Sequence, residues 1–181
     1  MSLNLIKTQT ASTGTRNSTF PDCFSAGYAW YKIAVIGIQP SQDNATLVVQ
    51  YVFNNNPEGA KYYNVAGYSN DSGGNTFYSY TNEPFIALGD YKHRGGADAT
   101  TGVNAVIQVY GPSTSNEKKC IDFKYAAPVS YQGSMCIAGG AGAFYQNESA
   151  VDGVNFFLID GNGNQIDMVG GKINIYGITG N

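Results

Sequence analysis

Short bursts of alternating apolar and polar residues recur along the chain, and this two-residue period constrains the fold more than any other feature. In residues 29–38, Tyr31, Ile33 and Val35 would share one face, and residues 103–110 alternate in the same way. Successive side chains of a β-strand point to opposite faces of its sheet, so the pattern predicts half-buried strands. No window shows a sustained 3.6-residue period, which argues against long amphipathic helices.

The strands predicted in this way are separated by turn clusters, with no linker, charge run or internal repeat between them. The run Asn70-Asp71-Ser72-Gly73-Gly74 predicts a hairpin turn. A glycine-rich segment, residues 134–145, has no clear assignment. About nine or ten short strands predict one all-β domain over residues 1–181, an antiparallel, jelly-roll-like β-sandwich. The expected strands are residues 3–10, 29–38, 47–53, 62–68, 75–80, 103–110, 118–125, 154–159 and 171–178.

The charge composition narrows the class of partner. Charged residues make up 13% of the chain, the formal net charge is -3, and Arg16 and Arg94 are the two arginines. Nucleic-acid-binding proteins concentrate Lys and Arg on one face, so we expect no nucleic-acid partner. No apolar run approaches the roughly 20 residues of a membrane-spanning helix, so we expect no membrane insertion.

The amino terminus lacks the apolar run of a signal peptide, which indicates synthesis in the cytoplasm. The three cysteines, Cys23, Cys120 and Cys136, show no metal-type spacing. Free thiols are the plain interpretation, and one disulfide with one spare thiol stays open.

The residues needed for catalysis are sparse. His93 is the only histidine and lies in a Lys-His-Arg-Gly-Gly turn, and no Gly-x-Ser-x-Gly elbow is present. A glycosidase needs two carboxylates facing each other across a cleft, and every glutamate lies in a predicted turn. We therefore expect a protein without enzymatic activity and without a cofactor, and keep a capsule-degrading hydrolase as a second alternative. The glutamates are Glu58, Glu83, Glu117 and Glu148.

Two motifs resemble ligand loops. Asp160, Asn162 and Asn164 place oxygen ligands at alternating positions, as calcium loops do, but Gln165 replaces the turn glycine and strands flank the segment. Asp-Gly and Asn-Gly are also common hairpin formers, so we expect a turn and treat the metal site as a weak candidate. The run from Gly139 to Ala143 resembles a phosphate loop only in its glycine content, and close backbone packing or a flexible loop explains it better.

A tyrosine cluster in the middle of the chain is the candidate ligand site. Aromatic faces stack on sugar rings while Asn and Asp form hydrogen bonds with hydroxyls, so a saccharide site is an alternative function. The competing interpretation is that these tyrosines fill strands and subunit contacts. The cluster comprises Tyr62, Tyr63, Tyr68, Tyr78 and Tyr80.

Three segments, in order, resemble a family of small structural proteins of tailed bacteriophages. The first is residues 5–12 (LIKTQTAS). The second is residues 31–40 (YKIAVIGIQP), followed by Asp43-Asn44 and residues 47–51. The third is residues 154–158 (VNFFL) with residues 171–178 (GKINIYGI). The segments frame nearly the whole chain, although residues 54–103 show no clear match.

The resemblance implies a virion component, either a head decoration or fibre protein or a tail-fibre domain. Such proteins are β-sandwiches and often trimers, so the family implies a homotrimer that docks on other virion proteins of the capsid or tail. Contact with a host surface glycan is a further expectation. The family carries no catalytic motif to transfer to this chain.

Overall fold

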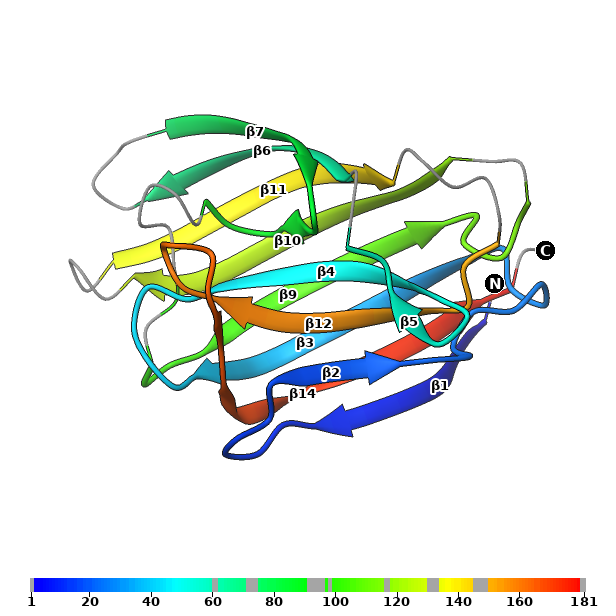
Figure 1. Cartoon of the computed structure of the whole chain (residues 1–181), viewed down its shortest axis with the longest axis horizontal. Coiled ribbons are helices and arrows are strands. Elements are labelled where there is room, and N and C mark those ends of the chain that lie inside the picture. Colours follow the sequence, from blue (N-terminus) through cyan, green and yellow to red (C-terminus); the bar gives the residue numbers. More distant parts are fainter. Residues whose placement is uncertain are drawn as a thin grey trace.

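A computed structural model describes residues 2–59, 62–70, 75–90, 97, 99–115, 118–129, 134–144 and 150–179. These residues form fourteen strands and no helix, arranged as two antiparallel sheets packed face to face (Figure 1). The prediction of an all-β antiparallel sandwich is therefore confirmed. The expected count of nine or ten strands is wrong, because four short strands lack a readable period and the glycine-rich segment is also a strand.

The larger sheet has eight strands. In spatial order they are β1 (Leu3–Thr10), β14 (Met168–Ile178), β3 (Trp30–Pro40), β9 (Val103–Tyr110), β10 (Lys119–Val129), β11 (Ser134–Phe144), β6 (Tyr62–Asn70) and β7 (Asn75–Glu83).

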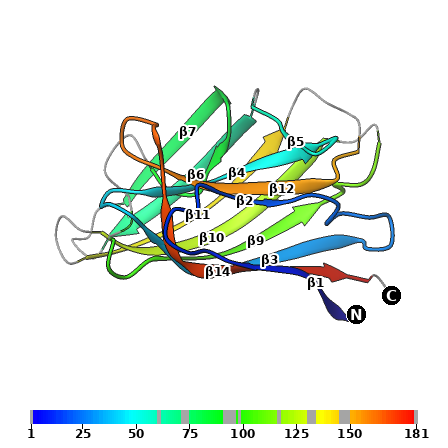
Figure 2. The same cartoon turned by 60° about the horizontal axis from the view of Figure 1, so that its bottom comes forward.

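The smaller sheet has six strands and covers the β14–β3–β9 part of the larger one (Figure 2). Its path is β13 (Gln165–Ile166), β12 (Gly153–Ile159), β4 (Thr46–Phe53) and β5 (Asn56–Pro57), with β2 (Asn17–Phe20) on β12 and β8 (Ile86–Ala87) on β4.

Eight of these strands pair in the nested order of a jelly roll. The order β1-β14-β3-β9 in one sheet faces β2-β12-β4-β8 in the other. In each layer, strands from early in the chain alternate with strands from late in the chain. The jelly-roll-like topology expected from the sequence is thus present in the paired strands.

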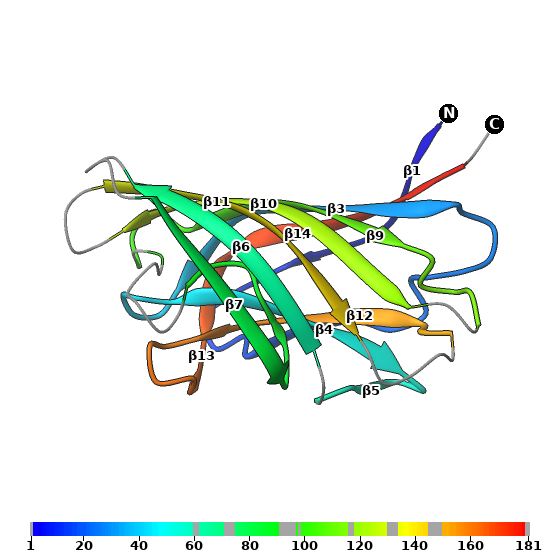
Figure 3. The same ribbon diagram turned by 90° about the horizontal axis from the view of Figure 1, so that it is seen from above.

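The remaining strands of the larger sheet come from two insertions. One insertion, between β4 and β8, supplies β6 and β7, and the other, between β9 and β12, supplies β10 and β11. The insertions meet where β11 pairs with β6, with Ala141 opposite Val65. They extend the larger sheet by four strands beyond the jelly roll, as seen from above in Figure 3.

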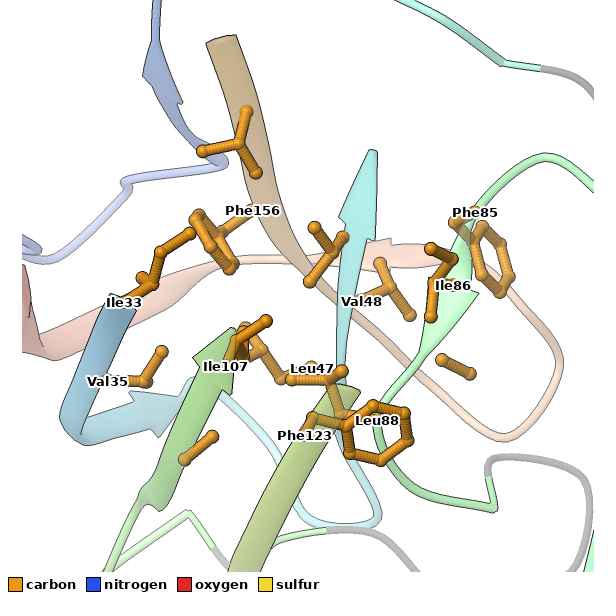
Figure 4. Close-up of a cluster of buried hydrophobic side chains, with 14 of the residues drawn as sticks. Ile33, Val35, Leu47, Val48, Phe85, Ile86, Leu88, Ile107, Phe123 and Phe156 are labelled. Atoms are coloured by element: carbon orange, nitrogen blue, oxygen red, sulfur yellow. The ribbon is translucent and has the colours of Figure 1, made fainter. Parts of the chain in front are cut away.

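The core lies between the two sheets (Figure 4). Ile33, Ile107 and Phe123 of the larger sheet meet Leu47 and Phe156 of the smaller sheet, and all of them are buried. Burying each such side chain stabilises the fold by roughly 1.5–3 kcal/mol. The alternation that predicted these strands therefore also determines the layer into which each side chain packs.

A bulge interrupts the alternation in β3. The register with β9 shifts between Val35 and Ile38, and Gly37 adopts a φ of 58° there. Glycine enters this left-handed region without a steric penalty. As a result Ile38 faces the core, although strict alternation would place it on the face opposite Val35.

The glycine-rich segment without a sequence assignment is β11, an interior strand between β10 and β6. A Cβ atom at Gly140 would lie 2.3 Å from the carbonyl oxygen of Val65. Close backbone packing is thus the reason for glycine at this position, and a phosphate loop is excluded because the backbone is paired on both sides.

Candidate functional site on the outer face of the larger sheet

The outer face of the larger sheet has no second layer over it among the described residues. Eight large apolar or aromatic side chains that are exposed to solvent alternate with buried neighbours in their strands and lie on this face. Leu3 and Leu5 of β1 share the face, because they pair with Ile178 and Tyr176, the partners of Trp30 and Lys32. Apolar patches of this kind on a protein surface mark interaction sites. The side chains are Ile36, Tyr63, Val65, Phe77, Val106, Tyr110, Met135 and Ile137.

One half of this face, the insertion patch, lies over β11, β6 and β7 and is formed by Tyr63, Val65, Phe77, Met135 and Ile137. Phe77, Ile137 and Val65 are 82%, 62% and 55% exposed. No outward position of the described parts of these three strands carries a charge. A hollow of about 380 Å³ lies beside the patch, and Cys120, Ala141 and Ala143 contribute to its lining.

The other half of the face is a polar and aromatic trough over β3, β9 and β10. It has a volume of about 370 Å³ and is lined by Trp30, Lys32, Val106, Gln108, Asp122, Phe123 and Lys124. The register places Lys32, Gln108 and Asp122 in one row across the three strands. The trough is therefore built by the pairing of three neighbouring strands.

An aromatic pair stands at one end of the trough. Trp30 and Tyr110 are directly opposite each other on β3 and β9, with ring centroids 6.3 Å apart and planes inclined by 25°. The Tyr110 hydroxyl lies 3.0 Å from Oδ2 of Asp122 and 3.2 Å from Oε1 of Gln108, and it donates its proton toward these acceptors. Partial burial and the Asp122 carboxylate raise the pKa of Tyr110, so the hydroxyl stays protonated.

The structure separates the five tyrosines predicted to form a saccharide site. Tyr62, Tyr78 and Tyr80 are buried on the inner face, and Tyr68 packs against the same core. Only Tyr63 belongs to the exposed outer face. The five residues therefore do not form one stacking surface, and the competing interpretation, that tyrosines fill strands, describes four of them.

The buried tyrosines form hydrogen bonds within the core instead. Tyr80 donates to Oδ1 of Asp90 at 2.6 Å, and both residues are buried. Tyr78 packs on Tyr80 and Tyr68, and its hydroxyl has no hydrogen-bond partner among the described residues. Burial raises the pKa of Tyr78, so this hydroxyl also stays protonated.

The weak metal candidate is a hairpin turn. Oδ1 of Asp160 accepts hydrogen bonds from the backbone nitrogens of Asn162 and Asn164, each at 2.8 Å, and Oδ2 accepts one from the Asn164 amide at 3.1 Å. Burial acts to raise the pKa of Asp160, but these hydrogen bonds outweigh it and lower the pKa. The carboxylate is used to close the turn between β12 and β13, as expected from the sequence.

The residues considered for catalysis fall partly outside the described residues, namely His93, Glu117 and Glu148. Glu83 ends β7 opposite Tyr62, and the backbone nitrogen of Glu58 donates to the carbonyl of Tyr51. Within the described ranges, no group of three or more His, Cys, Asp and Glu side chains could hold a metal ion. All three cysteines are free, with Cys120 exposed and the other two buried.

The trough was not found from the sequence. Alternation alone places Lys32 and Trp30, Gln108 and Tyr110, or Asp122 and Lys124 on one face of their own strands. Which strands are neighbours depends on the nested pairing of the jelly roll, which the local pattern does not contain. The order β3-β9-β10 together with its register would have been needed to predict the trough.

Comparisons with known proteins do not assign this chain to a family. Neither a protein-family model nor a curated protein sequence matches this chain. Among solved structures, it is similar to the Clostridium perfringens CspB protease and to the infectious bursal disease virus VP2 subviral particle, at 6% and 10% identity and a TM-score of 0.14 for each. The alignments cover 91% and 99% of this chain but only 25% and 42% of those chains.

A TM-score of 0.14 supports no conclusion about fold or function. The candidate site is therefore argued from its geometry alone. The described part of the chain contains no helix long and apolar enough to cross a membrane.

Proposed function

We propose that this chain is a non-enzymatic structural protein of a bacteriophage particle, a head decoration or fibre protein or a tail-fibre component. In this proposal it self-associates as a homotrimer and docks on other virion proteins, after synthesis in the host cytoplasm. The sequence resemblance of residues 5–12, 31–40, 43–44, 47–51, 154–158 and 171–178 to such proteins supports the proposal.

The observation that carries the proposal is the uncharged, apolar insertion patch. An exposed sheet face normally carries charged side chains that oppose association, and this half of the face has none at its described outward positions. Large exposed side chains such as Phe77 and Ile137 lose contact with water when a second copy covers them. A second copy of the same chain is therefore the occupant that we propose for the patch.

The fold is also suited to a particle component. A jelly roll pairs its strands in two packed sheets, which leaves few sheet edges open to unwanted pairing. The two insertions add the patch without interrupting the jelly-roll pairing, because β10 simply continues the sheet beyond β9. The scaffold and the contact surface are thus separate parts of the same sheet.

Two measurements test this function. Peptide mass spectrometry of purified phage particles should detect the chain in mature virions at a stoichiometry of many copies. Sedimentation equilibrium of the purified chain should give a trimer at micromolar concentration. Absence of the chain from mature particles would remove the virion assignment, and a stable monomer in sedimentation would remove self-association through the patch.

A further inference from the structure

The trough on β3, β9 and β10 has the chemistry of a binding site that is distinct from the insertion patch. Three consecutive rows of outward side chains cross the trough: Trp30 with Tyr110, then Lys32 with Gln108 and Asp122, then Val106 with Lys124. Outward residues in one strand repeat at roughly 7 Å, so the rows span roughly 14 Å along the strands. The trough is long enough for two linked sugar rings.

The aromatic row provides the stacking surface. Tyr110 is 40% exposed and Trp30 is half-buried, so each ring offers an open face or edge beside the trough. The C–H face of a pyranose ring is apolar and packs against indole and phenol rings. The direct cross-strand contact between the two rings holds them in place before any ligand arrives, which lowers the entropy that binding has to overcome.

The middle row provides the polar groups. The Asp122 carboxylate and the Gln108 amide are both oriented by the Tyr110 hydroxyl, and both can exchange hydrogen bonds with sugar hydroxyls. A pocket with a mainly apolar wall and a few fixed polar groups is the usual form of a small-ligand site.

The lysines determine which class of saccharide fits. Lys124 lies two residues along β10 from Asp122, and Lys32 lies in the row of Asp122 on the far side of Gln108. In the described part of the chain neither lysine forms an ion pair. Two ammonium groups against one carboxylate leave the trough with an excess positive charge, although the chain as a whole carries a formal net charge of -3. A carboxylate on the ligand would pair with the unpaired ammonium groups by charge-assisted hydrogen bonds.

From these observations we propose that the trough binds a saccharide containing uronic acid, with one sugar ring on Trp30 and Tyr110 and the ligand carboxylate between Lys32 and Lys124. This site uses none of the five tyrosines of the sequence prediction. It also goes beyond the proposed structural role, because a particle protein with this site would attach to acidic polysaccharides on a cell surface.

The test is calorimetric titration of the purified chain with two acidic probes, a hyaluronan tetrasaccharide and trigalacturonic acid, and with the neutral chitotetraose. We expect at least one acidic probe to bind more tightly than chitotetraose, and the difference to shrink as salt is added, because exposed charges are screened. Trp30→Ala should weaken binding roughly three- to tenfold through loss of the stacking contact. If this variant does not fold, Trp30→Leu replaces it.

The double variant Lys32→Gln/Lys124→Gln should bind acidic and neutral probes equally. Lys172→Gln is the matched control, since Lys172 is an exposed lysine on the outer face of the same sheet but outside the trough. No binding of either acidic probe, no preference over chitotetraose, or unchanged affinity in the double lysine variant would each overturn the proposal.

The outcome is independent of the proposed function. Phe77→Lys, which alters the insertion patch on β7, three strands away from β10, should leave saccharide affinity unchanged, and saccharide binding by the purified chain says nothing about its presence in particles. Failure of one proposal is therefore distinguishable from failure of the other.

Discussion

The hydroxyl of Tyr62 accepts a hydrogen bond from the backbone nitrogen of Tyr51 at 2.8 Å, and it donates one to the carbonyl of Glu58 at 2.9 Å. The two tyrosine rings lie stacked, with centroids 6.3 Å apart and planes inclined by 29°. The hydroxyl of Tyr51 is equally buried but has no hydrogen-bond partner among the described residues. This pair ties the first strand of the insertion, β6, to β4 of the smaller sheet.

The two hydroxyls should therefore respond differently to removal. Tyr62→Phe leaves the buried backbone nitrogen of Tyr51 and the part-buried carbonyl of Glu58 without this partner, and should lower the free energy of unfolding by about 1–3 kcal/mol. Tyr51→Phe removes an unsatisfied polar atom and should leave stability unchanged or raise it. Urea unfolding followed by fluorescence measures both, and an equal loss in the two variants would contradict this account of the pair.

Adjacent glycines in β11 give a second matched pair. At Gly140 a Cβ would lie 2.3 Å from the carbonyl oxygen of Val65, whereas at Gly139 the nearest atom would be 3.5 Å away. Gly140→Ala should force β11 and β6 apart and lower the melting temperature strongly, while Gly139→Ala should change stability by less than about 0.5 kcal/mol. Similar melting temperatures for the two variants would show that the sheet yields easily at this position.

A charge placed in the insertion patch should prevent self-association. Ile137→Lys puts an ammonium group in a surface that has to lose its water when a second copy binds, and a buried unpaired charge is strongly unfavourable. We expect this variant to sediment as a monomer. Leu5→Lys is the control, because Leu5 is 59% exposed but lies on β1, away from the patch. A trimer in the Ile137→Lys variant would place the interface elsewhere.

Thiol labelling should distinguish Cys120 from the other two cysteines. Burial raises the pKa of Cys23 to about 12 and that of Cys136 to about 11, so both should react only when the chain unfolds. Cys120 is exposed and lines the hollow beside the insertion patch, so it should react rapidly in Ile137→Lys. In the unaltered chain its reaction should slow as the concentration rises and copies cover the patch. Rapid labelling of Cys23 in the native state would contradict the packing around β2 and β12.

The raised pKa of Cys23 also predicts loss of stability in alkali. In the unfolded chain this thiol ionises near its ordinary pKa of 9.0, whereas burial raises its pKa to about 12 in the folded chain. Above pH 9.0 the unfolded state thus binds fewer protons than the folded state, so stability falls as pH rises toward 12. Urea midpoints across this range should decline, and the decline should be shallower in Cys23→Ala. The same slope in both proteins would rule out this thiol as a cause.

The long strands could be predicted from the sequence because one of their faces is buried against the core. Alternation located β3 and β9 to within a few residues, since an apolar residue at every second position has no other stable environment in a sandwich. The short strands β5 and β13 have two residues each and are defined only by the partner they pair with. The strand β11 has glycine where a readable pattern needs side chains.

For the candidate site, the sequence predicts the face of its own strand on which each side chain lies, but not which strands are neighbours. Consecutive residues of a strand face opposite sides, so Tyr62 and Tyr63 could never have belonged to one surface. The period that located β6 was sufficient to show this. The trough depends instead on which strands are neighbours, and the pairing of Trp30 with Tyr110 joins segments far apart in the chain. That information lies in the tertiary fold and not in any local pattern.

The nested pairing of β1 and β3 with β14 has a consequence for biosynthesis. Leu3 pairs with Ile178 and Ile33 with Ile175, so β1 and β3 both pair with a strand that is synthesised long after them. β3 can pair with β9 as soon as β9 is made, but β1 and the β14-facing edge of β3 stay unpaired until β14 has been synthesised. This backbone edge of β3 is open for that whole interval, so translation pauses between β12 and β14 should favour aggregation through it.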